Sequence, residues 1–361
     1  MKTALHLIMI AAVVLLWPAC VTHYAPEDLN DGWQVSTPEE QGVDPEKIED
    51  AYQGADRLNT IYSLLVVKNG FLIAEGYFNG QSVSNANSIA SVTKSFTSAL
   101  TGIALRENVL SHPDQKLMEF FPEIDWPSID PRKSTITLRQ MLQMRSGYPW
   151  EEFDGYLETL FATNNWIPFL HEFPLQADPG TRFGYSCLGA HMMAIVVARA
   201  AGTTLLEFAQ EFLFDPLGIT VAYWPTDELG YYHGSGDMRF RPRDLARFGQ
   251  LYLDRGLYLG RQIVPAQWVA DSFQDYSTTT YGSDIMSAIR QLRYGYFWWS
   301  GTSGSHRLHF AWGHGGQIIA VADDLNMVVV ATAASQSIFD NTSWDKEKAV
   351  LELVGRLIAS L

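Results

Sequence analysis

The sequence predicts an α+β protein: an antiparallel β-sheet flanked by helices, built from both chain ends, with an inserted all-α subdomain. Three observations predict this class. A β-hairpin pattern stands near the N-terminus, helical periodicity dominates the middle of the chain, and short strand-like runs return before a final amphipathic helix.

The predicted hairpin consists of two apolar runs, Ser63–Val67 and Phe71–Tyr77, separated by a turn that contains Asn69 and Gly70. Asn-Gly readily adopts the positive φ angles of a tight turn. A long helix is expected next, because apolar residues then recur at helical spacing at Val92, Phe96, Leu100 and Ile103.

The remaining elements follow from changes in periodicity. Four helices are expected at Leu138–Met144, Leu188–Ala201, Leu205–Phe214 and Leu245–Leu257. Four strands are expected at Tyr296–Ser300, Leu308–Trp312, Ile318–Val321 and Met327–Ala331. The range 343–361 predicts a last helix with Ser343 as its N-cap. We therefore expect one catalytic domain over residues 30–361, with an α/β part at about 30–120 and 290–361 and a helical part at about 121–289.

Length and composition indicate a globular enzyme-sized protein. The chain has 361 residues, of which 47% are hydrophobic, so it can bury a large core. Its formal net charge of -15 and the absence of a lysine-rich or arginine-rich run exclude nucleic acid as a partner.

The first twenty residues differ from the rest. Lys2 is followed by the uninterrupted apolar run Leu7–Trp17, and Cys20 comes shortly after it. This pattern predicts a signal peptide at residues 1–20, and the position of Cys20 resembles a bacterial lipoprotein processing site. We expect export to the periplasm or cell envelope, with membrane attachment through a lipidated Cys20. Cys187 is the only other cysteine, so no disulfide is expected in the mature chain.

Two serine-x-x-lysine spacings occur, Ser91 to Lys94 and Ser343 to Lys346. Spacing alone carries no weight, because chance supplies about one such match in a chain of this length. The surroundings separate them. Lys94 is the only charged residue between Ile89 and Leu105, whereas Lys346 stands between acidic residues on what reads as a solvated helix.

The apolar helix gives Lys94 a chemical role. No carboxylate lies within helical reach of it, and both burial and its place in the first turn favour the neutral amine of a general base. Ser91 lies one turn away on the same face, beside backbone N–H groups that can hold an oxyanion. Ser91 is therefore predicted to be a nucleophile and Lys94 its proton acceptor.

Two later motifs complete a family pattern. Tyr185 and Ser186 follow a Pro-Gly turn about ninety residues after Lys94, and His314-Gly315-Gly316 follows a predicted strand. In this order, the motifs resemble those of class C β-lactamase-like hydrolases and penicillin-binding proteins, over nearly the whole mature chain. Stretches at 136–147 and 241–249 are similar to the esterase and 6-aminohexanoate-dimer-hydrolase branch. The resemblance implies a β-lactamase/transpeptidase-like fold, proton transfer through Tyr185, and an oxyanion hole formed by the backbone amides of Ser91 and Gln317.

Two departures from the pattern bear on the substrate. Cys187 stands where the family usually has an asparagine that recognises a substrate amide, and His314 stands where lysine is common. Because imidazole is mostly neutral at pH 7, recognition of a substrate carboxylate becomes pH-dependent or absent. Tyr148, Trp150 and Trp166 are candidates to line an acyl pocket, although aromatic residues more often fill cores.

The predicted function is hydrolysis of a small carboxylic ester or amide through an acyl-enzyme on Ser91, with no cofactor. Alternatives are a β-lactamase or D-Ala-D-Ala carboxypeptidase and, from another class, a non-catalytic cell-envelope lipoprotein that binds peptides or proteins. No metal is expected, because His306 and His309 would point to opposite faces of a strand. An α/β-hydrolase elbow is not present, because Gly184–Leu188 lacks the final glycine.

Overall fold

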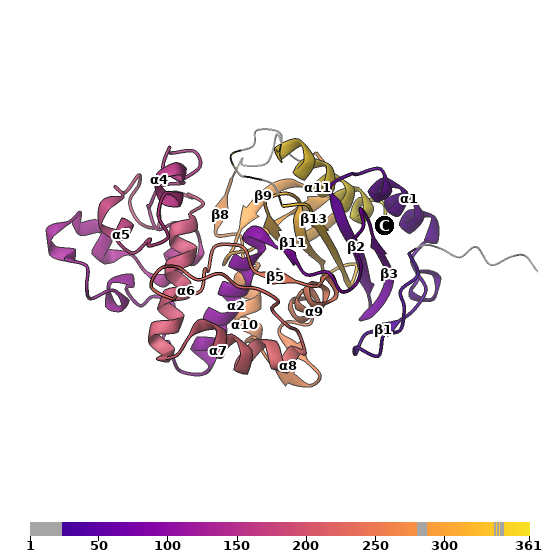
Figure 1. The fold of residues 1–361 in the computed structure, drawn as a ribbon, viewed down its shortest axis with the longest axis horizontal. Coiled ribbons are helices and arrows are strands. Elements are labelled where there is room, and N and C mark those ends of the chain that lie inside the picture. The colour runs from indigo at the N-terminus through magenta and orange to yellow at the C-terminus, as the bar shows by residue number, and fades with distance from the viewer. Residues whose placement is uncertain (1–23, 280–286, 336, 338, 340–342) are drawn as a thin grey trace, which may run out of the picture.

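The computed structural model describes residues 24–279, 287–335, 337, 339 and 343–361. It has the predicted α+β class: one large β-sheet carries helices on both sides, and a helical region lies at one end of the molecule (Figure 1). The predicted signal peptide, 1–20, and Cys20 lie outside the described residues.

The main sheet has nine strands in the order β1-β3-β2-β13-β12-β11-β10-β9-β8. Its neighbouring strands are antiparallel except for the pair β1–β3. The strands are β1 (Gln34–Val35), β2 (Ile61–Lys68), β3 (Phe71–Tyr77), β8 (Ser277–Thr278), β9 (Arg290–Tyr294), β10 (Trp299–Ser303), β11 (His306–Gly313), β12 (Gln317–Ala322) and β13 (Met327–Ala333). Because β2 pairs with β13, the sheet joins the two ends of the chain, as predicted.

Helices cover both sides of this sheet (Figure 1). On one side, α1 (Pro45–Asp56) packs with α11 (Ser343–Ala359). On the other side, α9 (Pro242–Leu253) packs on β12 and β13: a side chain at Gly249 would collide with Val328 and Ile319. The range expected to be helical, 121–289, therefore includes a helix that belongs with the sheet.

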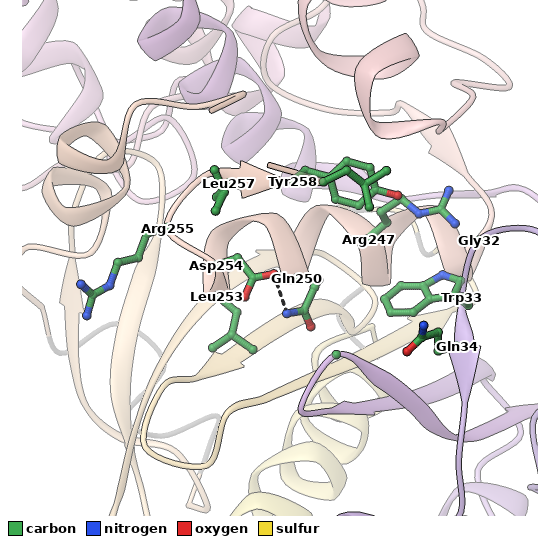
Figure 2. A pocket seen from close by; sticks show the side chains of 12 residues that line it. Gly32, Trp33, Gln34, Arg247, Gln250, Leu253, Asp254, Arg255, Leu257 and Tyr258 are labelled. Atoms are coloured by element: carbon green, nitrogen blue, oxygen red, sulfur yellow. Dashed lines mark hydrogen bonds between the residues drawn. The ribbon is translucent and has the colours of Figure 1, made fainter. Parts of the chain in front are cut away.

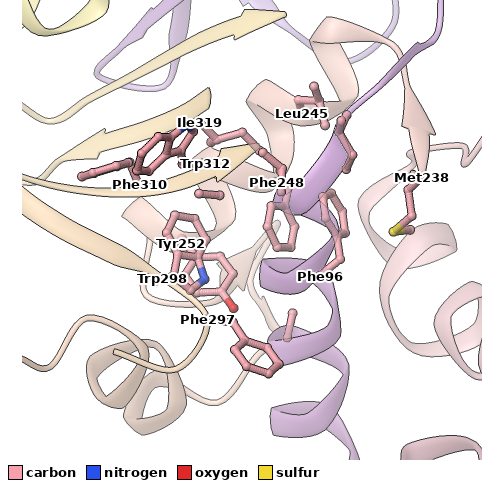
Figure 3. Packing of buried hydrophobic residues seen from close by; sticks show 14 of the residues in the cluster. Phe96, Met238, Leu245, Phe248, Tyr252, Phe297, Trp298, Phe310, Trp312 and Ile319 are labelled. Atoms are coloured by element: carbon pink, nitrogen blue, oxygen red, sulfur yellow. The ribbon is translucent and has the colours of Figure 1, made fainter. Parts of the chain in front are cut away.

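The helix α2 (Thr93–Arg106) runs through the centre of the molecule, between the sheet and α6 (Cys187–Ala201). Every residue from Thr93 to Ala104 is buried, which confirms the predicted apolar environment of Lys94. Phe96 stacks on Phe248 (Figure 3), with ring centroids 3.8 Å apart. It also stacks on Phe240, with ring centroids 4.9 Å apart. This packing fixes the helix that carries the predicted nucleophile at its N-terminus.

The other α-helices are shorter. They are α3 (Leu138–Leu142), α4 (Leu157–Phe161), α5 (Phe169–Glu172), α7 (Leu205–Ala209), α8 (Asp215–Leu217) and α10 (Ala266–Ser272). Within the described ranges, no single helix is long and apolar enough to cross a bilayer; α6 together with Leu205–Leu217 passes that test only as a pair bent by 83°.

Three predicted boundaries are wrong for local reasons. The helix expected to reach Leu257 ends at Leu253, because Arg255 and Gly256 adopt positive φ and turn the chain into the hairpin of β6 (Leu257–Tyr258) and β7 (Arg261–Gln262). The strand expected at Tyr296–Ser300 begins only at Trp299, because Phe297 has φ of 56° in the turn that follows β9. Ser343 is the first residue of α11, and its buried hydroxyl has no hydrogen-bond partner among the described residues.

Candidate active site

The hydroxyl of Ser91 opens into a pocket of about 370 Å³ at the N-terminal end of α2. Ser91 lies in a short 3-10 turn, Ala90–Val92, that leads into the helix. The preceding residue, Ala90, has φ of 44°, a conformation that costs energy for a residue with a Cβ. Such strain is concentrated at functional sites, and here it presents the Ser91 side chain at the start of the helix.

Lys94 lies directly below Ser91 and is 1% exposed. Its ammonium nitrogen is 3.0 Å from Ser91 Oγ, 2.7 Å from the carbonyl oxygen of Ser235 and 3.6 Å from Cys187 Sγ. The predicted pairing of Ser91 with Lys94 is thus present in the geometry. The Ser235 carbonyl is a partner that the sequence did not reveal.

The protonation state of Lys94 differs from the prediction. Burial lowers the pKa of Lys94, but interactions with Cys187, Tyr185 and Glu151 outweigh burial, so the pKa is raised above that of an ordinary lysine. Three acceptors around the nitrogen also suit an ammonium group. The prediction of a neutral amine considered only neighbours within helical reach, and it missed Cys187, Tyr185 and Glu151, which approach from other segments.

Tyr185 stands beside the same ammonium, with Lys94 Nζ 4.8 Å from the centre of its ring. Burial raises the pKa of Tyr185, although Lys94 and a hydrogen bond with Ser91 act to lower it. The phenol is therefore protonated at neutral pH. Its ring stacks on Trp299 at 5.7 Å, which holds it at the pocket wall.

Cys187 is held at the N-terminus of α6 by a buried carboxylate. Glu151, 2% exposed, accepts hydrogen bonds from the amides of Cys187 and Leu188, both at 3.0 Å, and from Ser186 Oγ at 2.7 Å. Burial raises the pKa of the Cys187 thiol to about 11. No periodicity marks Glu151 in the sequence; its place beside two candidate pocket residues, Tyr148 and Trp150, was the only available signal.

His314 lies on the opposite wall and is paired with a residue of α11. Its Nδ1 is 2.8 Å from Oε2 of Glu347, whose side chain is 1% exposed. Burial lowers the pKa of His314, but the hydrogen bond and charge of Glu347 raise it above its ordinary value. The helix around Lys346 was expected to be solvated, and at Glu347 that expectation is wrong, because this face of α11 packs over the turn after β11.

Gly313, the last residue of β11, lies close to the Ser91 amide. A Cβ at Gly313 would be 3.0 Å from Ser91 N and 2.4 Å from the carbonyl oxygen of Ile89. Gln317, the predicted oxyanion donor, is paired with Gly313 in the β11–β12 ladder, and its buried side chain bonds to Ala333. It does not line the pocket, whereas the end of β11 does.

Aromatic rings make up much of the remaining wall. The lining includes Trp150, Phe161, Tyr185, Trp299, Trp312 and Trp344. Two other candidates are absent from it. Tyr148 is buried with its hydroxyl on the carbonyl of Leu170, and Trp166 packs against His191 inside the helical region. Gly315 and Gly316, with φ of 86° and 96°, shape the turn itself.

A larger hollow of about 540 Å³ lies apart from Ser91, between α9, β1 and the β6–β7 hairpin (Figure 2). It contains no nucleophile paired with a base. Among the described residues, no group of three or more His, Cys, Asp or Glu side chains is arranged to hold a metal ion.

A strained serine beside a buried lysine and a tyrosine, at the junction of a large sheet and a helical region, is the arrangement that the resemblance to β-lactamases leads one to expect. The chain belongs to the Beta-lactamase family, whose model matches residues 62–350. This is a family of hydrolases that share the β-lactamase fold.

Individual relatives agree with this assignment. The chain is 24% identical over 249 residues to 6-aminohexanoate-dimer hydrolase from Paenarthrobacter ureafaciens, covering 66% of this chain and 63% of that protein. It is 32% identical over 177 residues to lovastatin esterase from Penicillium rubens, covering 44% and 42%. The octameric penicillin-binding protein homologue from Pyrococcus abyssi has a TM-score of 0.62 at 18% identity, covering 86% of this chain and 77% of that one. The chain thus spans less than two thirds of the length of the 6-aminohexanoate-dimer hydrolase and of the lovastatin esterase.

Proposed function

We propose that this protein hydrolyses small carboxylic esters or linear amides through an acyl-enzyme on Ser91. The observation that carries the proposal is the 3.0 Å approach of Lys94 Nζ to Ser91 Oγ at the floor of an aromatic-lined pocket. Its similarity to proteins named 6-aminohexanoate-dimer hydrolase and lovastatin esterase supports a linear amide or an ester as substrate.

The arrangement assigns a role to each group. In the active form of the site, the pair formed by the Lys94 ammonium and the Tyr185 phenol has lost one proton. This pair accepts the Ser91 proton as Oγ attacks the carbonyl carbon of the substrate. The amide of Ser91 and the backbone at the end of β11 are placed to stabilise the oxyanion. Tyr185 returns the proton to the departing alcohol or amine. Water, deprotonated by the same pair, then attacks the acyl-enzyme and releases the acid with Ser91 restored.

Labelling with a fluorophosphonate tests the nucleophile. The wild type should form a covalent adduct that Ser91→Ala abolishes. Ser343→Ala, at the second serine-x-x-lysine spacing, is the matched control and should label like the wild type. An adduct that persists in Ser91→Ala contradicts the assignment, and no adduct in any variant favours a non-catalytic binding protein.

A substrate panel tests the reaction. Intact-mass kinetics with a p-nitrophenyl ester, a 6-aminohexanoate dimer, a penicillin and a D-Ala-D-Ala peptide should show an adduct that forms and decays with the ester or the linear amide. A long-lived penicillin adduct without ester turnover would instead indicate a penicillin-binding protein.

A further inference from the structure

Acidic side chains outnumber basic ones in the described lining of the pocket that contains Ser91. Of the lining residues that the structure describes, four are acidic, Glu151, Glu152, Asp237 and Glu347, and none is a lysine or an arginine. Lys94 lies beneath the floor with its ammonium engaged by Ser91, Cys187 and the carbonyl of Ser235. Among the described lining residues, His314 is therefore the one that can add a positive charge near a substrate carboxylate, although its Nε2 is buried.

The carboxylate of Glu347 contacts the imidazole of His314 directly. Its Oε2 lies 2.8 Å from His314 Nδ1 and accepts a hydrogen bond from the amide of Gly315 at 2.7 Å, while Oε1 accepts one from Trp312 Nε1 at 2.6 Å. With its side chain only 1% exposed, the carboxylate is screened little by water. Its negative charge therefore offsets the positive charge of a protonated His314.

The His314–Glu347 pair lies close to the place where the substrate carbonyl would meet Ser91. Trp312 and His314 both line the pocket, and Gly313 between them lies against the Ser91 amide. A group attached near the scissile carbonyl would therefore approach the His314–Glu347 pair. Because the pair has no net positive charge, it offers a substrate carboxylate no compensation for leaving water.

We propose that Glu347 determines the substrate charge: by pairing with His314 it makes the site reject esters or amides with a carboxylate near the scissile bond and accept neutral or ammonium-bearing ones. The inference rests on the proposed function and narrows its substrate class. The aromatic wall agrees with it, because tryptophan and tyrosine faces attract organic cations and not carboxylates.

The test compares p-nitrophenyl esters of matched chain length that end in a methyl, a trimethylammonium or a carboxylate group. In the wild type, kcat/KM for the carboxylate ester should be at least about tenfold below that of the neutral ester, with the ammonium ester equal to or above the neutral one. Equal or faster hydrolysis of the carboxylate ester overturns the inference. It leaves the proposed function intact, which fails only if no ester shows Ser91-dependent turnover.

Glu347→Gln removes the charge while nearly preserving the shape. At pH 5.5, where His314 can carry a proton without Glu347, the carboxylate-to-neutral ratio of kcat/KM should rise by about tenfold, mainly through KM, while the neutral ester reports the folded active fraction. Asp345→Asn removes an exposed acid from the same helix and should leave the ratio unchanged. An unchanged ratio in Glu347→Gln, or an equal rise in Asp345→Asn, contradicts the role of Glu347.

A second variant separates two ways in which Glu347 could act. Because Glu347 raises the pKa of His314 against burial, the imidazole of Glu347→Gln carries a proton only in more acidic solution. If Glu347 acts by neutralising His314, the gain for the carboxylate ester in Glu347→Gln should therefore appear at pH 5.5, fade at pH 8, and disappear when His314→Ala is added. A gain that persists in the double variant would show that Glu347 repels the carboxylate directly and would overturn the part assigned to His314. If Glu347→Gln does not fold, the wild-type ratios still decide whether the site rejects carboxylates.

Discussion

The ammonium of Lys94 donates a hydrogen bond to the backbone carbonyl of Ser235, 2.7 Å away and 141 residues later in the chain. Ser235 belongs to the segment 234–238, in which Gly234 O accepts from Thr97 and the Met238 amide donates to Thr93. The lysine is therefore held from two sides, by its own helix and by this segment, in the position from which it reaches Ser91.

Replacing Lys94 should nearly abolish acylation. Lys94→Met keeps the length of the side chain and removes the proton acceptor, so the burst of p-nitrophenol at pH 7.5 should fall by about 10³-fold, since general base catalysis contributes about 10² to 10⁴. Stopped-flow absorbance measures it. Retained turnover in a folded variant would remove Lys94 from the proposed mechanism.

The rate of ester hydrolysis should increase as the pH rises. Since the pKa of Lys94 is raised, the form of the site that lacks one proton is scarce at neutral pH and increases as the pH rises. The kcat/KM for a neutral ester should therefore climb by about tenfold per pH unit above pH 6 until it levels off in alkaline solution. A profile that is flat from pH 6 to 9 would contradict this protonation state.

The thiol of Cys187 should be unreactive although it lines the pocket. With a pKa of about 11, only about 0.1% of it is thiolate at pH 8, and the thiolate is the reactive form. In a Cys20→Ser background, iodoacetamide should modify Cys187 far more slowly than free cysteine, as followed by intact mass. Rapid alkylation would show that Lys94 lowers this pKa strongly.

Glu151 should matter for the stability of the fold. Glu151→Gln leaves buried donors at the start of α6 without a charged acceptor, which should cost about 3 kcal/mol of the free energy of unfolding. Urea denaturation measures it, and Glu152→Gln, at the exposed neighbouring position, should cost less than about 0.5 kcal/mol. Equal costs in the two variants would show that the buried hydrogen bonds are not the cause.

Acid should destabilise the fold through His309, which stacks on Phe273 at 4.0 Å and has a pKa lowered to about 3 by burial. Below pH 6.5 the unfolded chain binds a proton that the folded one does not. Stability is therefore intact above pH 6.5 and falls as the pH drops towards 3, by about 2 kcal/mol at pH 5.

His309→Leu should remove this share of the acid sensitivity. The difference in the free energy of unfolding between pH 7 and pH 5 should shrink in His309→Leu and stay unchanged in His112→Leu, at an exposed position. His233, with a pKa lowered to about 4, adds an independent loss of the same sign in both variants. No change in His309→Leu would mean that His309 is already protonated in the fold.

Local patterns predicted much of this molecule because they act over a few residues. The hairpin turn has its positive φ angles at Asn69 and Gly70, and α2 and α6 bury the residues whose spacing predicted them. The partners that define the site were not predictable in this way. Glu151 reaches Cys187 from 36 residues away and Glu347 reaches Gly315 from 32, and nothing in helical or strand periodicity encodes such pairs.

The joining of β2 to β13 also sets the order in which the protein can become active. Ser91 and Lys94 are synthesised early, but β11 and Glu347, which complete the pocket, come more than two hundred residues later. Contacts so distant in sequence form late and slowly during folding. A chain still being synthesised thus carries Ser91 without a complete pocket, and the proposed hydrolysis can begin only once the last strands and the final helix have docked.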